Sequence, residues 1–194
     1  ISPDLHNSGV DFAAWCTYKY MNSGPGSLGG LFVHEKHGHN KDLPRFSGWW
    51  NHNKETRFNM RQPFDVIPGA EGWQLSNPPI LSMAAIKASL DMFNEIGMEA
   101  LREKSKKLTG YFEYLIHQIG SDAIKIITPS NPKERGCQLS IQVKNADKSL
   151  HQKLTAVNII TDWREPDVIR CAPVPMYNSF EDVYRMVTIL KSLI

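Results

Sequence analysis

The hydrophobic pattern of this chain changes near residue 78. Before that point, two short and mostly apolar runs at residues 10–16 and 29–36 are typical of strands, and a glycine-rich segment separates them. Residues 37–68 are polar, aromatic and without a helical period, and such a long unpatterned segment in a compact protein is more often a functional loop than a spacer. The pattern therefore predicts strands, a turn and an extended loop in the first part of the chain.

After residue 78 the apolar positions recur with a helical period. The pattern predicts one amphipathic helix that begins after Pro79 and ends at Gly97, and a second helix over residues 98–120. Their predicted buried faces consist of Met83, Ile86, Leu90 and Phe93 in the first helix, and of Leu101, Leu108, Phe112, Leu115 and Ile119 in the second.

Strands and helices alternate in the rest of the chain. The predicted order is a strand at 123–129, a strand at 138–144, a helix at 147–157, strands at 158–163 and 168–174, and a C-terminal helix. Ser179 and Asp182 have the spacing of a capping box, and the helix that follows is predicted to bury Phe180, Val183, Val187 and Leu190. This alternation indicates an α/β or α+β module, with a domain boundary between residues 1–77 and 78–194.

The composition is that of an ordinary globular protein and argues against several classes of function. Of the 194 residues 41% are hydrophobic and 22% are charged, and a net charge of +2 gives no field that would select nucleic acid or an acidic membrane as a partner. No apolar run approaches the roughly 20 residues that span a bilayer. Cys16, Cys137 and Cys171 lack CxxC spacing, which argues against a disulfide framework or a zinc ribbon and fits a reducing compartment such as the cytoplasm.

Two kinds of chemistry compete for the segment TYKYMNSGPGSLGG, residues 17–30. A GxGxxG pattern from Gly24 to Gly29 matches the dinucleotide-binding fingerprint, but Pro25 interrupts it and a strand pattern follows where that site needs a helix. Lys19 is flanked by two tyrosines and follows an apolar strand. An amine drawn into an aromatic site has a lowered pKa and becomes a usable nucleophile, as a Schiff base requires. On spacing alone, a solvated lysine beside a plain turn is the alternative.

The segment DFAAWCTYKYMNSGPGSLGGLFVHEKH closely resembles the active-site lysine segment of kynureninases, which are pyridoxal-phosphate enzymes of the aspartate-aminotransferase fold (fold type I). Further segments resemble the same family in the same order, namely GWWNHNKETRF, IPGAEGWQLSNPPIL, ALREKSKKLTGYFEYLI, ITPSNPKERGCQL and IRCAPVPMYNSFEDVY. The resemblance implies that residues 1–77 are the end of a large cofactor-binding domain and that residues 78–194 are a small α+β C-terminal domain.

The resemblance also implies roles for five residues. Lys19 would form the Schiff base with pyridoxal phosphate, and Tyr18, Trp49 and Asn77 would bind the cofactor phosphate, completing the site across a dimer interface. Arg170 would hold the α-carboxylate of the substrate. A phenol, an indole and an amide are suitable phosphate donors, and a guanidinium suits a carboxylate.

The implied activity is hydrolytic cleavage of kynurenine to anthranilate and alanine, a step of tryptophan catabolism, by a cytoplasmic homodimer; 3-hydroxykynurenine is an equally open substrate. Lys19, once displaced by substrate, would carry a proton at the α-carbon, and Tyr18 is a candidate second relay. The family's partners of the cofactor ring lie upstream of the part that aligns with Leu5 and His6. We therefore expect these 194 residues to be the C-terminal part of a longer enzyme and to lack turnover alone.

Other interpretations remain beside this one. A class V aminotransferase or cysteine desulfurase has a similar lysine segment, and a non-catalytic remnant would keep the fold without the reaction. His34, His37 and His39 do not make an HExxH zinc motif, because Gly38 occupies the position of its second histidine, so no metal is expected.

Overall fold

The computed structural model describes residues 3–59 and 63–194, and their contacts divide the chain into two compact units. One unit comprises Pro3–Glu95 and the other Ile96–Ile194. The contacts place residues 78–95 with the first unit. The predicted domain boundary between residues 77 and 78 concerns the whole enzyme and stays a prediction.

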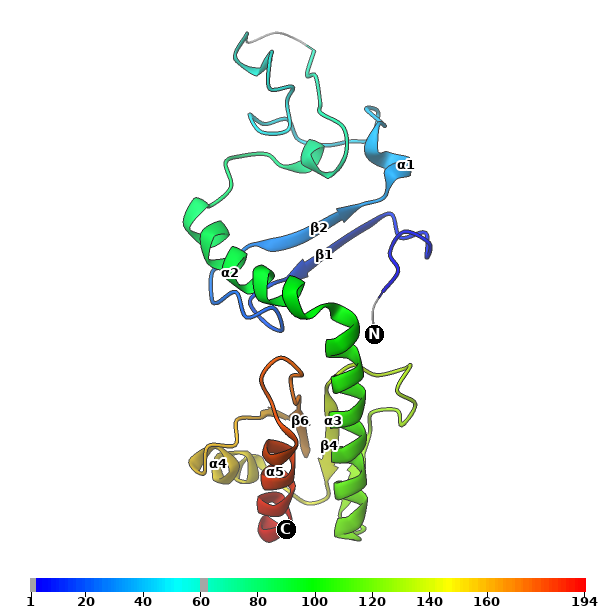
Figure 1. The fold of residues 1–194 in the computed structure, drawn as a ribbon, viewed down its shortest axis with the longest axis vertical. Helices are drawn as coiled ribbons and strands as arrows, with labels where there is room; N and C mark the ends of the chain where they lie inside the picture. The colour runs from blue at the N-terminus through cyan, green and yellow to red at the C-terminus, as the bar shows by residue number, and fades with distance from the viewer. Residues whose placement is uncertain (1–2, 60–62) are drawn as a thin grey trace. The chain divides into compact units, whose positions relative to one another are not determined.

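The first unit is built around a β-hairpin. Strands β1 (Phe12–Cys16) and β2 (Gly29–Val33) pair antiparallel, with Trp15 opposite Gly30 (Figure 1). Both predicted strands are confirmed, but the second ends earlier than expected because His34 begins the short helix α1 (Glu35–Gly38), where its Nδ1 accepts a hydrogen bond of 3.2 Å from the Lys36 amide. In its described residues the loop predicted at 37–68 is irregular chain, apart from the end of α1 and a 3₁₀ turn at Arg57–Asn59, whereas residues 60–62 of the prediction lie outside the described residues. A second 3₁₀ turn at Ala70–Trp73 follows the loop.

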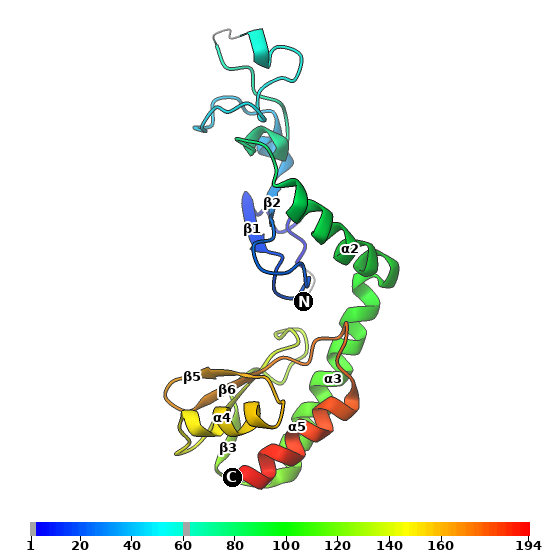
Figure 2. The same cartoon turned by 90° about the vertical axis from the view of Figure 1, so that its left-hand side faces the viewer.

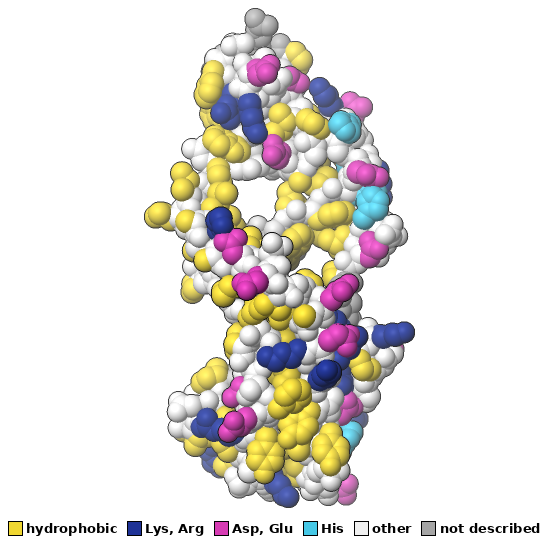
Figure 3. Space-filling model, in the orientation of Figure 1, with side chains coloured by type: hydrophobic (Ala, Val, Ile, Leu, Met, Phe, Trp, Pro, Cys, Tyr) yellow, Lys and Arg dark blue, Asp and Glu magenta, His cyan; other side chains and the backbone are white. Residues whose placement is uncertain are grey.

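Helix α2 (Ile80–Ile96) completes the first unit. Its predicted apolar face is only partly buried: Ile86 is 9% exposed, whereas Met83 and Leu90 are 43% and 41% exposed. The other buried residue of α2 is Ser89, which bonds the Met21 carbonyl in the connection between β1 and β2. The buried side of α2 therefore includes a polar residue and differs from the predicted apolar face. Figure 3 shows hydrophobic side chains on the surface over α2. Across the described ranges, no helix combines the length and apolarity needed to cross a bilayer.

The second unit is an antiparallel sheet covered by helices. Its elements are α3 (Met98–Ile119), β3 (Ile124–Ile126), β4 (Leu139–Val143), α4 (Lys148–Ala156), β5 (Asp162–Arg164), β6 (Val168–Cys171) and α5 (Phe180–Leu193), with strand order β3-β4-β6-β5. All pairs of neighbouring strands are antiparallel, so the module is of the α+β kind. The predicted elements are confirmed, although β5 includes only the end of its predicted range.

The core of the second unit lies on one face of this sheet. Leu139, Ile141, Ile169 and Cys171 alternate along β4 and β6 and pack with residues of α3, α4 and α5 in one buried cluster. Figure 2 shows α4 and α5 beside the strands of this sheet. The residues between them, including Ser140 and Arg170, therefore belong to the opposite, polar face. This face carries the predicted carboxylate-binding arginine.

In the second unit, the predicted faces of α3 and α5 are confirmed with one exception. Leu108 and Phe112 of α3 are almost completely buried, and so are Val183, Val187 and Leu190 of α5. Phe180 is the exception: it is 45% exposed because it lies in the first turn of α5 and packs edge-on against Tyr111 at the margin of the core. The capping box is confirmed, since Ser179 Oγ accepts from the Asp182 amide at 3.1 Å and Asp182 Oδ2 accepts from the Ser179 amide at 2.8 Å.

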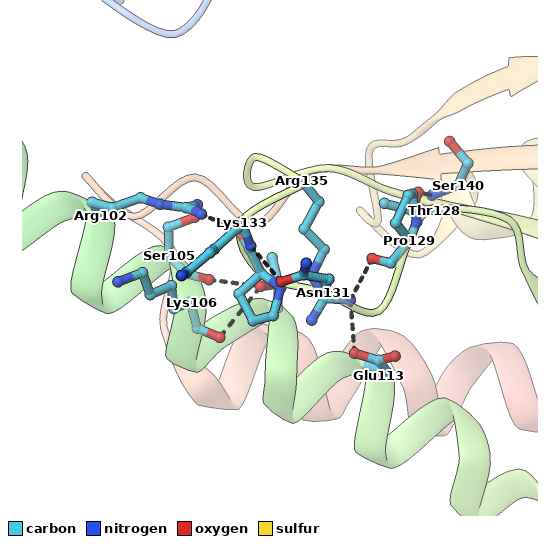
Figure 4. Close-up of polar contacts among 12 residues, drawn as sticks. Arg102, Ser105, Lys106, Glu113, Thr128, Pro129, Asn131, Lys133, Arg135 and Ser140 are labelled. Atoms are coloured by element: carbon cyan, nitrogen blue, oxygen red, sulfur yellow. Dashed lines mark hydrogen bonds and ion pairs between the residues drawn. The ribbon is translucent and has the colours of Figure 1, made fainter. Parts of the chain in front are cut away.

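A buried ion pair fixes the loop between β3 and β4 to helix α3. Arg135 Nη1 lies 2.7 Å from Glu113 Oε2, and the two side chains are 2% and 15% exposed (Figure 4). The same nitrogen donates to the Pro129 carbonyl at 3.2 Å. Burial opposes ionisation of Glu113, but hydrogen bonds from Ser130 and Arg135 outweigh it and hold the pKa of Glu113 below its ordinary value. The loop is thus anchored by charge in an apolar setting.

Candidate active site

Lys19 lies in the connection between β1 and β2. Gly24 and Gly26 have positive φ angles of 82° and 75°, and Asn22 has a φ of 54°, so three left-handed residues reverse the chain here. A strand, β2, follows these glycines, whereas a dinucleotide site requires a helix N-terminus at that point. The glycines therefore shape the connection that presents the lysine.

A network of hydroxyl groups holds this connection together. Thr17 and Ser23 are 3% and 8% exposed, and Ser23 Oγ donates to Thr17 Oγ1 at 2.8 Å. Thr17 Oγ1 in turn donates to the Leu28 carbonyl on the return side of the connection. Neither residue was predicted from the sequence, although small hydroxyl residues at both ends of a glycine-rich turn are a recognisable signal. These hydrogen bonds hold the backbone of the connection that carries Lys19 in one conformation.

The lysine itself is exposed together with its aromatic neighbours. Lys19 Nζ lies 5.6 Å from the centroid of the Tyr18 ring, and Tyr18 and Tyr20 are 48% and 49% exposed. A hydrogen bond with Cys16 raises the pKa of the Tyr18 phenol above its ordinary value. The expectation of an enclosed, aromatic lysine site is therefore not met within the described residues, because the hairpin that carries Lys19 is itself half-exposed at Phe12 and Trp15.

The segments that carry Trp49 and Asn77 lie side by side. Gly48 is packed so closely on Leu75 that a Cβ atom added to the glycine would lie 2.1 Å from the Leu75 carbonyl oxygen. The Trp50 amide donates to the same carbonyl at 3.4 Å. The indole of Trp49 is half-exposed and lies 5.4 Å from the ring of Phe58. Trp49 thus stands beside the chain that leads to the exposed Asn77.

The buried side chain of Asn51 forms hydrogen bonds with the backbone of this part of the loop. Its side chain is fully buried, accepts from the Gly48 amide at 2.8 Å, and donates to the Phe46 and Gly72 carbonyls at 2.9 and 3.3 Å. A buried amide that satisfies several backbone groups can hold a loop in one conformation without regular structure. The sequence analysis did not select Asn51, because its role depends on a backbone segment more than 20 positions away.

Helix α2 ties the lysine connection to the segment of Asn77. Ser89 Oγ donates to the Met21 carbonyl, and Ser82 Oγ donates to the Gly26 carbonyl at 3.2 Å. These serines are seven positions apart and therefore lie on the same side of the helix. Four of the predicted site residues, Lys19, Tyr18, Trp49 and Asn77, are consequently carried by one connected scaffold.

Arg170 belongs to the other unit, on the polar face of its sheet. Its side chain is 34% exposed, and its Nε donates to Asp162 Oδ2 at 2.8 Å. The hydrogen bond from Arg170 has the largest effect and holds the pKa of the Asp162 carboxyl below its ordinary value. Burial opposes this shift, and the charge of Arg164 adds to it. The predicted carboxylate-binding residue therefore already has an anionic neighbour.

The chemistry of these side chains is limited to a few possibilities. Tyr18, Trp49 and Asn77 supply neutral O–H and N–H donors that suit an anion such as phosphate, and the amine of Lys19 suits an aldehyde. In the described ranges, no three histidine, cysteine, aspartate or glutamate side chains gather as metal ligands would. His37 instead bonds Asp11 at 2.7 Å, and His34 stacks on His6 at 4.7 Å.

Comparison with known proteins identifies the second unit. Residues 101–190 match the family model described as "Kynureninase C-terminal domain". This part of the chain is thus similar to the C-terminal domain of kynureninases. The chain is 56% identical over 187 residues to a kynureninase of Myxococcus xanthus and 54% identical over 194 residues to one of Flavobacterium johnsoniae, which covers 96% and 98% of this chain but only 44% and 46% of those kynureninases. The chain thus spans less than half the length of the curated kynureninases it matches.

Solved structures agree on the fold. An apo cysteine desulfurase from Thermococcus onnurineus NA1 matches with a TM-score of 0.72 at 16% identity, covering 94% of this chain and 46% of that one. A C-DES mutant with glycine covalently linked to its PLP cofactor matches with a TM-score of 0.74 at 17% identity, covering 97% and 47%. At these identities the likeness concerns the fold alone, and it confirms the predicted class: the kynureninase-like chain has the architecture of the C-terminal part of such enzymes.

Proposed function

We propose that this chain supplies the lysine-bearing segment and the small domain of a kynureninase, which hydrolyses the Cβ–Cγ bond of kynurenine, or of its 3-hydroxy derivative, to an anthranilate and alanine. The observation that carries the proposal is sequence identity of 53–56% to kynureninases over 94–98% of the chain, including the hairpin of Lys19. The fold neighbours include cysteine desulfurases, but at 15–16% identity they do not favour that reaction.

The residues present fit pyridoxal phosphate as cofactor. Tyr18, Trp49 and Asn77 are exposed donors on one scaffold, and they would bind the phosphate through a phenol, an indole and an amide. The exposed amine of Lys19 would attach the cofactor through its aldehyde carbon. When bound, the cofactor acts as the electron sink for the bond that breaks.

Lys19 would have a second task once the substrate amine has replaced it. Its free amine would carry a proton to and from the substrate α-carbon. The hydrogen bond between Ser23 and Thr17 holds the backbone of the connection in place around this lysine. Tyr18 precedes Lys19 and would relay a proton in addition to binding phosphate. Arg170 would hold the substrate α-carboxylate.

We further propose that the whole enzyme is a cytoplasmic homodimer in which residues 1–77 belong to the cofactor domain and 78–194 to the small domain. Support comes from the apolar surface of the first unit, where Phe46, Phe58, Ile80 and Leu81 are each more than 70% exposed. Apolar side chains exposed to this extent are typical of a surface that another protein segment or subunit buries. Light scattering after gel filtration of the whole enzyme tests the dimer, and a monomeric mass would contradict it.

A chimera tests the activity. In it, this chain replaces the matching 44% of the Myxococcus xanthus kynureninase, and anthranilate release is followed by fluorescence. The chimera should cleave kynurenine, and Lys19→Ala should lower turnover by about 10³-fold or more. Borohydride reduction of the loaded chimera should label the peptide of Lys19. Lys41→Ala, which removes an exposed lysine of the same unit paired with Asp65 at 3.3 Å, is the control and should keep full activity.

Other outcomes would overturn the proposal. A loaded chimera that releases sulfur from cysteine, or transaminates with an added keto acid, but leaves kynurenine intact would move the chain to the desulfurase or aminotransferase reaction. A borohydride label at another residue would remove Lys19 from its role. Tyr18→Phe with unchanged cofactor affinity and unchanged turnover would dismiss Tyr18 from both of its tasks.

A further inference from the structure

Asp162 and Arg170 face each other across two strands of the second unit. They are opposite partners in the antiparallel pair β5–β6, and Ser140 of β4 is opposite Arg170 on its other side. Opposite residues project to the same face of a sheet, which here is the polar face away from the core. The arginine therefore lies between an acidic and a hydroxyl residue on one surface.

The contact uses only one edge of the guanidinium. Nε and one terminal nitrogen of Arg170, Nη2, both donate to the same carboxylate oxygen of Asp162, Oδ2. Within the described part of the chain, the other terminal nitrogen, Nη1, makes no hydrogen bond. A guanidinium presents its donors in a flat fork, so the edge formed by the two terminal nitrogens still has donors for a second carboxylate.

The local charge also favours a second anion. Arg164 Nη2 lies 3.0 Å from the same Oδ2 of Asp162, so two guanidinium groups share one carboxylate and leave an excess of one positive charge. Arg170 is the less exposed of the two arginines, at 34% against 58% for Arg164. A partly buried charge is screened less by solvent than an exposed one, and this places the stronger attraction at Arg170.

We propose that Asp162 is a positioning residue for substrate binding: it holds Arg170 in the orientation in which the free edge of its guanidinium receives the α-carboxylate. The inference rests on the proposed function, because it takes Arg170 as the carboxylate-binding residue. A free arginine side chain loses considerable rotamer entropy on binding, and a partner that fixes it beforehand removes that cost from the binding step. Asp162 makes no contact with substrate in this arrangement and acts through Arg170.

The experiment uses the chimera with the Myxococcus xanthus kynureninase. Asp162→Ala should raise KM for kynurenine about 10-fold and change kcat by less than about 3-fold, because the lost interaction serves binding. Asp162→Asn keeps an oxygen acceptor at the same position and should raise KM only about 3-fold. Asp167→Ala is the matched control, since it removes a neighbouring carboxylate that bonds Gln142 at 3.1 Å and not Arg170, and it should stay within about 2-fold of the parent.

A ligand comparison separates positioning from a general folding defect. L-Alanine and ethylamine differ by the carboxylate alone, so Asp162→Ala should weaken inhibition by L-alanine about 10-fold and leave that by ethylamine unchanged. Equal weakening of both ligands, an unchanged KM or a lowered KM would overturn the inference, the last because Asp162 would then compete with the substrate for Arg170. If the parent chimera does not cleave kynurenine, or if Arg170→Lys leaves KM unchanged, then the proposed function itself is wrong. If both behave as proposed and only the Asp162 variants do not, the positioning role alone is wrong.

Discussion

Ser89 of helix α2 donates a hydrogen bond to the carbonyl of Met21, two positions beyond Lys19. Ser89 is only 4% exposed, and this partly buried contact joins a helix to a glycine-rich connection that has no ladder of its own. The position of the lysine backbone therefore depends on a helix that begins some 60 positions later in the chain.

Replacing Ser89 should loosen this connection. Ser89→Ala leaves the Met21 carbonyl without its partner in a partly buried place, which should lower the free energy of unfolding by about 1 kcal/mol. Urea unfolding of the chimera measures the change. Ser82→Ala is the control: its bond to the Gly26 carbonyl is exposed, so less than about 0.5 kcal/mol is expected, and equal losses in both variants would contradict the argument.

Gly48 should not tolerate a side chain. The Cβ of Gly48→Ala would lie 2.1 Å from the Leu75 carbonyl oxygen and 2.9 Å from its Cα, and backbone atoms cannot move away as a side chain can. We expect a loss of about 2–3 kcal/mol in stability and weaker cofactor binding, because the segments of Trp49 and Asn77 would separate. Fluorescence titration with pyridoxal phosphate measures the second effect.

Gly30→Ala provides the comparison for this prediction. Its Cβ would also be too close, at 2.2 Å from the Trp15 ring, but that ring is 44% exposed and can rotate outward. The loss of stability should therefore be smaller than in Gly48→Ala. A larger loss would show that the Trp15 ring is held in place and that the reasoning from its exposure is wrong.

The ion pair between Arg135 and Glu113 should be costly to break from one side. Arg135→Met leaves a carboxylate uncompensated beside helix α3 and should destabilise the second unit by about 3 kcal/mol. The double variant Arg135→Met with Glu113→Leu removes both charges and should recover much of that loss. Urea unfolding of the parent, of each single variant and of the double variant forms a double-mutant cycle, and simple additivity of the two single losses would contradict a coupled pair.

Asp11 should contribute to acid stability in a defined range of pH. Hydrogen bonds from Lys36 and then His37 lower its pKa from an ordinary 3.8 to about 2 in the folded protein. Because the folded pKa is the lower one, the stabilisation is complete above pH 3.8 and is lost as the pH falls toward 2. Thermal melts of the parent and of Asp11→Asn should differ by a constant amount near neutral pH and converge at acid pH. A gap that widens on acidification would contradict the assignment.

Much of the fold could be read from local pattern. The helix over 98–119 shows its period in Leu101, Leu108 and Phe112, and the capping box at Ser179 marks the start of the last helix. The faces of α2 could not be read in this way. Met83 and Leu90 have helical spacing and are nevertheless exposed, while Ser89 is buried, because burial depends on which partner lies opposite.

The candidate site divides in the same manner. Lys19, Tyr18, Trp49, Asn77 and Arg170 were selected because the segments that carry them resemble those of one enzyme family. Asn51, Ser82 and Asp162 were not, because each acts on a residue that is distant in sequence or on another strand.

By itself the sequence determined the helices, the strands, the capping box and the motifs that resemble one enzyme family, because these depend on residues within a few positions of one another. The tertiary structure alone decided that Asp162 lies opposite Arg170, that Gly48 touches the backbone of Leu75 and that Ser89 holds the carbonyl of Met21. Each of these follows from strand register or chain crossing, which joins positions that no local pattern relates.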